Sequence, residues 1–268
     1  MFKYIAGNNR QKVLNYSKEL LKNNKYPIIN YILENNRNNK EKVYNEYSRL
    51  LENLDQSYKI ALKLSSLNFD EKLLFKLIES YNKEGLSIVI DAEDNKNNER
   101  YNKLTNDLML NYNNSNPTII KTYQMYRTDS LKELCNNIKI MKNQNKILGT
   151  KLVRGAYYNT EKYDGHIFNK KEDTDKNYNN AIIECLKYYN SYNIIATHNQ
   201  QSLDLASSLN KPNFSLAHLM GMNEQVMNKL KLNNKVYTYV PYGPYKEMIP
   251  YLTRRLYENI DTIKYMVL

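Results

Sequence analysis

The sequence has little of what marks disulfide-rich, metal-binding or nucleotide-binding proteins: only two cysteines and seven glycines in 268 residues, and no tryptophan. Cys135 and Cys185 both lie in segments with helical patterns, which argues against a disulfide framework and favours a reducing intracellular compartment. The three histidines, His166, His198 and His218, have no Cys or carboxylate partners at metal-ligand spacing, so we expect no metal site. Neither GxGxxG nor GxxxxGK[ST] occurs, which excludes the Rossmann and P-loop modes of binding a nucleotide.

Long apolar runs are missing as well. No stretch approaches the roughly 20 apolar residues of a membrane helix. The first residues, MFKYIAGNNRQ, contain neither an apolar signal region nor an Arg/Ser-rich presequence. We therefore expect an intracellular protein without signal or transit peptide, soluble or peripherally associated with a membrane.

Charge is abundant and unbalanced. Lys and Arg number 39 against 28 Asp and Glu, for a formal net charge of +11, and the mean hydropathy is −0.75. A basic surface attracts nucleic acids or anionic lipids. Here, however, the lysines are scattered, and Asn, Lys and Tyr are frequent along the whole chain, which indicates a low-GC genome. We expect no nucleic-acid partner.

Short runs rich in Ile, Val, Leu and Tyr recur with helical patterns between them. Eight runs predict strands, over 28–33, 59–65, 86–93, 118–126, 147–155, 192–199, 214–221 and 236–243. Residues 70–81 predict a helix with one apolar face behind an Asp70 cap, and residues 174–186 predict another that begins with Thr174 as its cap. Eight alternating units in about 250 residues predict an α/β fold, the (βα)8 TIM barrel. We expect one domain over residues 1–268, with the charged stretch 161–178 as a loop at the barrel mouth.

Polar residues gather where the predicted strands end: Lys63, Asp91, Glu93, Gln124, Lys151, Arg154, Thr197, His198, Asn199 and Tyr239. In (βα)8 barrels the chemistry lies at the carboxyl ends of the strands. Each residue also has an ordinary explanation: Asp91 or Glu93 as a helix cap, and His198 as a hydrogen-bonded interior side chain. For His218 we favour a packing role. Together the strand-end residues predict an active site at this rim.

The segment YVPYGPYKEMIPYLTRRLYEN, residues 239–259, predicts a helix that begins at Pro250. Tyr251, Arg254 and Arg255 then fall at i, i+3 and i+4, on one helix face. Two guanidinium groups beside a phenol suit two-point binding of a small carboxylate or phosphate. The alternative is a solvated basic helix end.

The order and spacing of these motifs resemble the proline dehydrogenase family, flavoproteins that oxidise L-proline. The resemblance rests on YIAG, LKLS, IDAED, YQMYR, KLVRGAYY, KEDTDKNY, ATHN, LMGM and YLTRRLYEN, among which KLVRGAY and YLTRRLYEN are the most specific. It implies a distorted (βα)8 barrel with the last helix over the mouth, and noncovalently bound FAD. The implied reaction is hydride transfer from the proline carbon next to nitrogen to flavin N5, giving 1-pyrroline-5-carboxylate, the first step of proline catabolism. The implied electron acceptor is a quinone, reached at a membrane surface.

The resemblance also implies roles for individual residues. Asp91, which orders the site, and Lys151 are the expected catalytic residues. The expected substrate-binding residues are Lys63, Tyr157, Leu219, Tyr239, Tyr251, Arg254 and Arg255. The expected cofactor-binding residues are Ala92, Gln124, Lys151, Val153, Arg154, Gly155, Tyr158, Thr197, His198 and Glu258. In this scheme the two arginines hold the proline carboxylate, and Tyr158 takes the place of an aromatic residue that stacks on adenine.

Some features depart from the family pattern. At position 151 many bacterial members carry Arg, whereas this chain has Lys, which resembles the eukaryotic type. At position 218 this chain has His, where the eukaryotic type usually has Gln. We expect no counterpart here of the helices that precede the barrel in most members, of the aldehyde dehydrogenase domain or of the DNA-binding segment. The resemblance is therefore to a monofunctional, minimal enzyme.

Two other functions stay open at this point. An imine-forming barrel lyase would use Lys63 or Lys151 and would be colourless. A basic binding protein that retains the fold without flavin would bind nucleic acid in a salt-sensitive way. Flavin absorbance of the purified protein separates both from a dehydrogenase.

Overall fold

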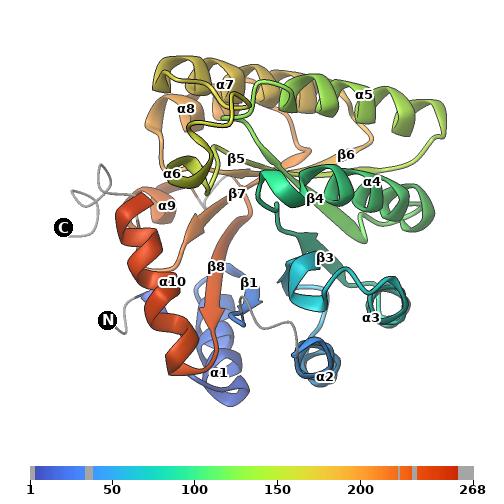
Figure 1. Ribbon diagram of the computed structural model, residues 1–268, viewed down its shortest axis with the longest axis vertical. Helices are drawn as coiled ribbons and strands as arrows, with labels where there is room; N and C mark the ends of the chain where they lie inside the picture. Colours follow the sequence, from blue (N-terminus) through green and yellow to red (C-terminus); the bar gives the residue numbers. More distant parts are fainter. Residues whose placement is uncertain (1–3, 34–38, 223, 231–233, 259–268) are drawn as a thin grey trace. The chain divides into compact units, whose positions relative to one another are not determined.

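The eight strands of the barrel are all present in the computed structural model, which describes residues 4–33, 39–222, 224–230 and 234–258. They are β1 (Tyr26–Tyr31), β2 (Lys59–Leu62), β3 (Ser87–Ile90), β4 (Ile119–Gln124), β5 (Leu148–Val153), β6 (Ser191–Ala196), β7 (Phe214–Leu219) and β8 (Val236–Tyr242). The strand order is that of a closed barrel, β1 to β8 in sequence (Figure 1). The predicted (βα)8 fold is confirmed. The predicted strands overran at their carboxyl ends, where the chain turns into helices or loops.

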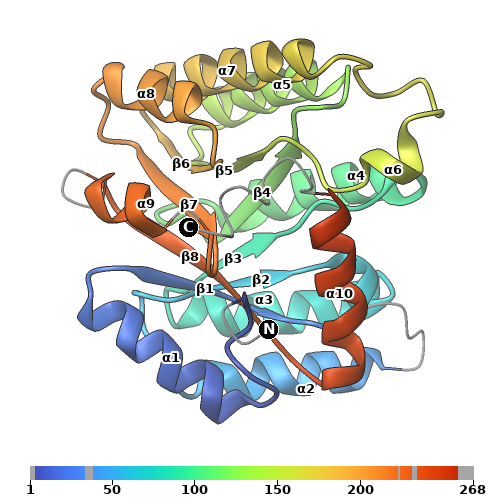
Figure 2. The same ribbon diagram turned by 90° about the vertical axis from the view of Figure 1, so that its left-hand side faces the viewer.

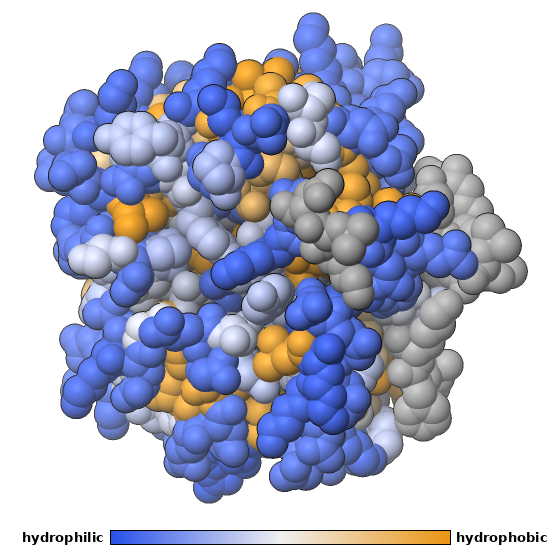
Figure 3. All heavy atoms as spheres, turned by 180° about the vertical axis from the view of Figure 1, so that it is seen from behind, coloured by the Kyte–Doolittle hydropathy of each residue, from blue (hydrophilic) through white to orange (hydrophobic). Residues whose placement is uncertain are grey.

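The helices follow the strands in alternation. They are α1 (Arg10–Lys22), α2 (Lys40–Leu51), the 3-10 helix η2 (Leu64–Leu67), α3 (Glu71–Lys83), α4 (Asn95–Tyr112), α5 (Ser130–Asn143), α6 (Tyr158–Glu161), α7 (Lys171–Lys187), α8 (Gln200–Ser208), α9 (Glu224–Leu230) and α10 (Tyr245–Glu258). None of these helices, within the part of the chain that the structure describes, is long and apolar enough to cross a membrane. The face of the molecule seen in Figure 3 is largely hydrophilic, with small apolar areas between charged side chains.

The chain divides into two compact units, Met1–Asp91 with Ala217–Leu268, and Ala92–Leu216. In the first unit α1 packs on β1 and β8, and α2 lies against α3 (Figures 1 and 2). In the second unit α5 and α7 lie side by side, and α7 also packs on α8, β5 and β6 (Figure 2). Ile60 and Leu62 of β2 are fully buried, as expected for parallel strands covered by helices.

The predicted helix over 70–81 is confirmed as α3. The Asp70 carboxylate accepts a 3.2 Å hydrogen bond from the Leu73 N–H, which satisfies one of the backbone donors at the helix start. Leu74, Leu77, Ile78 and Tyr81 of this helix are buried.

Two other predicted helix starts were wrong. Helix α7 begins at Lys171, so Thr174 lies inside it, and the charged stretch predicted as a loop contributes residues 171–178 to this helix. Helix α10 begins at Tyr245, and Pro250 lies inside it. A Thr or a Pro is favourable at a helix start, but neither residue prevents the preceding turn from being helical when tertiary packing supports it.

Candidate active site

A phenol on β8 meets a carboxylate that follows β3 in the first unit. The Tyr239 hydroxyl, on β8, donates a 2.6 Å hydrogen bond to Oδ2 of Asp91, which follows β3. Asp91 is 8% exposed, and its own N–H donates to the Leu62 carbonyl at 2.9 Å. Burying a carboxylate is costly unless it is hydrogen-bonded, so this contact helps to hold Asp91 in place. The structure therefore brings together two predicted site residues that lie 148 positions apart in the sequence.

Two further predicted residues of this unit are partly accessible. Lys63 directly follows β2, where it precedes the first residue of η2, and it is half-buried. Leu219 is the last residue of β7 and is also half-buried. A cation and an apolar side chain thus remain partly open at these strand ends.

His218 has the packing role that the sequence favoured. It is 3% exposed, with Nδ1 2.9 Å from the Met222 carbonyl and Nε2 2.9 Å from Oγ1 of Thr238. Because a carbonyl only accepts, Nδ1 carries the proton and Nε2 accepts from the Thr238 hydroxyl. Burial lowers the pKa of the imidazole, which favours this neutral form.

In the second unit, Gln124 ties the end of β4 to two other backbone segments. Its Nε2 donates to the Glu93 carbonyl at 3.0 Å, and its Oε1 accepts from the Ala156 N–H at 3.1 Å. The side chain is 4% exposed. On the neighbouring strand Lys151 is 6% exposed, and Val153, two residues further along the same strand face, is half-buried.

Arg154 is a firmly anchored cation among the predicted cofactor residues. Its guanidinium donates to Asp175 at 2.6 Å, to Oγ1 of Thr197 at 2.5 Å and to Oγ of Ser202 at 3.0 Å. The ring of Tyr178 lies 4.4 Å from its Cζ. These bonds use three of the five guanidinium N–H groups, so an orientated cation retains donors for an anion.

The turn that follows Arg154 requires glycine. Gly155 has φ +147°, and a Cβ there would come within 1.8 Å of the Tyr126 ring. The chain then enters α6, which Tyr157 precedes and Tyr158 begins. The Tyr157 hydroxyl donates to the Ala92 carbonyl at 3.3 Å, whereas Tyr158 is 47% exposed. An accessible aromatic ring therefore follows the anchored arginine by four residues.

Two residues that follow strands, Asp94 and Asn199, cap the next helix. Asp94, rather than Asp91 or Glu93, caps α4, with its Oδ1 3.2 Å from the Asn97 N–H. Asn199 caps α8 by accepting from the Ser202 N–H at 3.1 Å. His198, between Thr197 and this cap, is half-buried.

The remaining predicted residues lie on α10. The structure describes the helix at these positions but not the side chains of Tyr251, Arg254, Arg255 and Glu258. The partners Asp175 and Ser202 of Arg154 were missed in the sequence. Asp175 lies within KEDTDKNY, a motif of the family resemblance that had no assigned role, whereas Ser202 had no sequence signal.

The donors of the second unit fit an anionic, aromatic cofactor such as FAD. They include the guanidinium of Arg154, which the Thr197 hydroxyl helps to hold as an acceptor, and the side chain of Lys151. The exposed ring of Tyr158 is available for stacking. Fixed cations with free N–H donors suit a diphosphate. Among the described residues, no three His, Cys, Asp or Glu side chains are grouped as metal ligands.

Comparisons with known proteins concern the family and the fold of the chain. The family model described as proline dehydrogenase matches residues 13–266. Proline dehydrogenase 1, mitochondrial, of Dictyostelium discoideum is 32% identical over 207 residues, which cover 69% of this chain and 36% of that protein. The carbapenem antibiotics biosynthesis protein CarD of Pectobacterium carotovorum subsp. carotovorum is 30% identical over 215 residues, which cover 76% of this chain and 57% of that protein.

Solved structures show the same fold. Proline utilization A (PutA) from Bdellovibrio bacteriovorus, inactivated by N-propargylglycine, is similar with a TM-score of 0.87 and 19% identity, over 96% of this chain and 32% of that chain. A PutA of Bradyrhizobium japonicum is similar with a TM-score of 0.83 and 19% identity, over 96% of this chain and 30% of that chain. The chain thus spans about a third of the length of these PutA proteins.

Proposed function

The chain belongs to the proline dehydrogenase family, and from this we propose that it catalyses the flavin-dependent oxidation of L-proline to 1-pyrroline-5-carboxylate. The observation that carries the proposal is the family match over residues 13–266, which includes all of the strand-end residues described above. We also propose that residues 1–268 form one barrel domain, which the closed order of the eight strands supports.

We assign substrate binding chiefly to the first unit. Lys63, Arg254 and Arg255 bind the proline carboxylate through charge-assisted hydrogen bonds. Asp91 orders the site by accepting from Tyr239, and the ring of Tyr239 then forms a wall beside the pyrrolidine. Leu219, Tyr157 and Tyr251 provide the other apolar and aromatic walls. Close walls exclude water from the carbon that loses its hydride.

We assign cofactor binding to the second unit and to the end of α10. FAD, when bound, supplies the acceptor for the hydride. Arg154, with Thr197, holds the diphosphate, and Tyr158 stacks on the adenine. Lys151, a catalytic residue in this proposal, and Gln124 lie beside the flavin ring, where a fixed cation stabilises the negative charge that reduction brings. The other proposed contacts are Ala92, Val153, Gly155, His198 and Glu258.

The test is the absorbance of the purified protein before and after anaerobic addition of L-proline. We expect a yellow protein that proline bleaches at alkaline pH, where the substrate amine is neutral. Full flavin occupancy without bleaching by excess proline would refute the activity. A colourless protein that borohydride links to its substrate would indicate the lyase, and salt-sensitive nucleic-acid binding without flavin would indicate the binding protein.

We further propose that electrons leave to a quinone at a membrane surface. The formal charge of +11 supports attraction to anionic lipid. Anaerobically reduced enzyme should be reoxidised rapidly by a soluble quinone analogue. Rapid reaction with oxygen but not with the quinone would contradict this acceptor.

A further inference from the structure

Helix α6 and its N-cap residue provide two of the proposed binding residues, but the helix is too short to hold its own position. It comprises four residues, Tyr158–Glu161, and Tyr157 precedes it as the N-cap residue. A single helical turn is unstable in water because nucleation is unfavourable. The placement of Tyr157 and Tyr158 must therefore come from contacts that α6 makes with the rest of the second unit.

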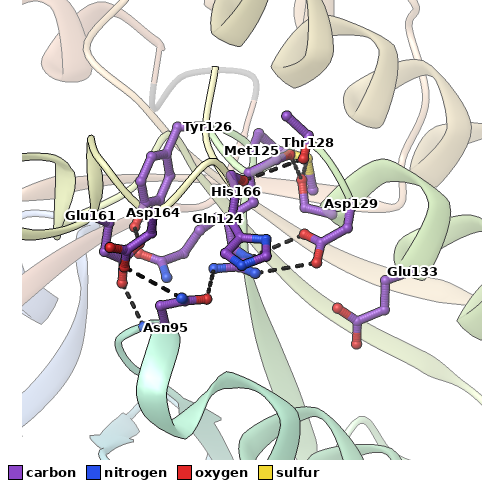
Figure 4. Close-up of polar contacts among 12 residues, drawn as sticks. Asn95, Gln124, Met125, Tyr126, Thr128, Asp129, Glu133, Glu161, Asp164 and His166 are labelled. Carbon is purple, nitrogen blue, oxygen red and sulfur yellow. Dashed lines mark hydrogen bonds and ion pairs between the residues drawn. The ribbon is translucent and has the colours of Figure 1, made fainter. Parts of the chain in front are cut away.

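The last residue of α6 makes such contacts. Glu161 is 2% exposed, and its two carboxylate oxygens have different partners. Oε1 accepts a 2.6 Å hydrogen bond from the Asn95 N–H, and Oε2 accepts one from the Tyr126 hydroxyl (Figure 4). A buried carboxylate without hydrogen bonds would be strongly destabilising, so these two bonds define where Glu161 lies.

Both partners are themselves firmly placed. Asn95 is the first residue of α4, an 18-residue helix, whose first N–H groups have no partner within the helix and carry a partial positive charge. The Asn95 side chain also accepts from Arg127 at 3.0 Å, and Arg127 in turn forms a two-point ion pair with Asp129. The carboxylate of Glu161 is thus bonded to a rigid helix end.

Tyr126 contacts the chain before and after α6 as well. Its ring lies where a Cβ on Gly155 would be, before the helix. Its carbonyl accepts from the Phe168 N–H at 2.8 Å, after the helix. Burial, and to a smaller extent the hydrogen bond to Glu161, raise the pKa of the Tyr126 phenol, so the phenol remains a donor at any physiological pH.

We propose that Glu161 is a positioning residue for the flavin and proline site, because its bonds to Asn95 and Tyr126 set the position of α6 and thereby of Tyr157 and Tyr158. This inference rests on the proposed function, since the positioned rings are those assigned to substrate and adenine. It adds a residue outside the predicted binding set, joined to the site through the β5–α6 connection.

Three variants separate this role from a general contribution to folding. Glu161→Ala removes both bonds. Glu161→Gln keeps one acceptor and provides an amide N–H₂ that donates to the Tyr126 oxygen, so it should restore most of what Ala loses. Tyr126→Phe keeps the ring against Gly155 and removes one bond. Glu184→Gln is the matched control, because Glu184 lies in the same unit and pairs with Lys187 on the exposed face of α7.

The measurements are FAD affinity, from quenching of flavin fluorescence by apoprotein, together with proline kcat and KM and the melting temperature of each holoenzyme. We expect Glu161→Ala to weaken FAD binding by about tenfold, the effect of roughly one lost buried hydrogen bond, and to raise KM more than it lowers kcat. Glu161→Gln should recover most of the affinity, Tyr126→Phe should show a smaller change in the same direction, and the control should match the wild type.

Two results would refute the positioning role of Glu161. If Glu161→Ala lowers only the melting temperature and keeps wild-type FAD affinity and KM, the positioning role is refuted. If that variant does not fold, wild-type FAD affinity and KM in Tyr126→Phe refute it instead. Failure of the proposed function would appear in the wild type, as absence of flavin binding or of proline oxidation, whereas failure of this inference would appear only in the variants.

Discussion

The hydroxyl of Tyr239 donates a 2.6 Å hydrogen bond to Oδ2 of Asp91. Tyr239 lies in the middle of β8 and Asp91 directly after β3, so the bond joins two strands that are distant in the sequence. The hydroxyl of Tyr239 is thus bonded within the protein, and we expect its ring to be the part that contacts substrate. The ring and the hydroxyl can therefore be tested separately.

Tyr239 should determine selectivity against 4-hydroxyproline through its ring. Tyr239→Ser opens space and should raise kcat/KM for hydroxyproline relative to proline, whereas Tyr239→Phe keeps the ring and should keep the selectivity. Phe also leaves the Asp91 carboxylate short of one donor, which costs about 1–3 kcal/mol when the group is buried, so proline turnover should fall. The measurement is kcat/KM for both substrates. Efficient use of hydroxyproline by the wild type would show that Tyr239 is not the selectivity wall.

Arg254 and Arg255 should hold the proline carboxylate. Replacing either with Met removes charge-assisted bonds of roughly 1.5–3 kcal/mol and should weaken proline binding by about one to two powers of ten, with flavin retained. Lys keeps the charge but loses the planar fork, so it should recover part of the loss. Apparent proline affinity and flavin content of the four variants decide this. A solvated helix end would leave kinetics unchanged and shift stability by no more than about 0.5 kcal/mol.

Lys59 should make stability rise with pH. It begins β2, is 6% exposed and lies 3.3 Å from the Ser87 hydroxyl. Burial, and to a smaller extent repulsion from Lys235, lower its pKa from 10.5 to about 7. Between these two values the unfolded chain binds the proton and the folded chain does not, so the free energy of unfolding increases with pH, by up to about 1.4 kcal/mol per pH unit.

Lys59→Met removes this titration. Urea unfolding from roughly pH 7 to 9.5, below the range in which tyrosines titrate in the unfolded state, should show a smaller rise with pH in the Met variant than in the wild type. Lys72→Met, on the exposed face of α3, is the control and should keep the wild-type slope. Equal slopes in all three proteins would show that Lys59 is protonated when folded.

The two thiols should differ in reactivity. Cys185 is fully buried on α7, and burial raises the pKa of its thiol to about 12, whereas Cys135 on α5 is partly exposed. Because the thiolate is the reactive form, a brief treatment of the folded protein with iodoacetamide at roughly pH 8 should label Cys135 alone, and labelling in denaturant should reach both. Mass spectrometry of the wild type and of Cys135→Ser tests this; rapid labelling of folded Cys135→Ser would contradict the burial of Cys185.

Much of the fold could be predicted from local patterns. The eight strands and the Asp70 cap of α3 are present as predicted, because apolar periodicity and cap residues act over a few neighbouring positions. Helix starts were less predictable. Asp94 rather than Asp91 or Glu93 caps α4, and three acidic residues within four positions offer local patterns of similar strength.

The site could be predicted in its residue types but not in its contacts. Lys63, Asp91, Gln124 and Arg154 were recognisable because each lies at the end of an apolar run. Their bonds were not, because Arg154 reaches Asp175 on α7 and Ser202 on α8, which depends on how helices pack. Glu161 lay in a stretch predicted to be a loop, where nothing in the charge pattern indicates a buried carboxylate.

The difference between what the sequence determined and what only the tertiary structure decided has a physical basis. Alternating apolar and polar segments are sufficient to specify strands, helices and a parallel barrel, because each segment must bury one face. The bonds of Tyr239 to Asp91 and of Glu161 to Asn95 and Tyr126 form between positions far apart in the chain. Whether a carboxylate at such a position is solvated, caps a helix or is buried against a phenol depends on the neighbours that the folded chain brings to it, and only the tertiary structure decides that.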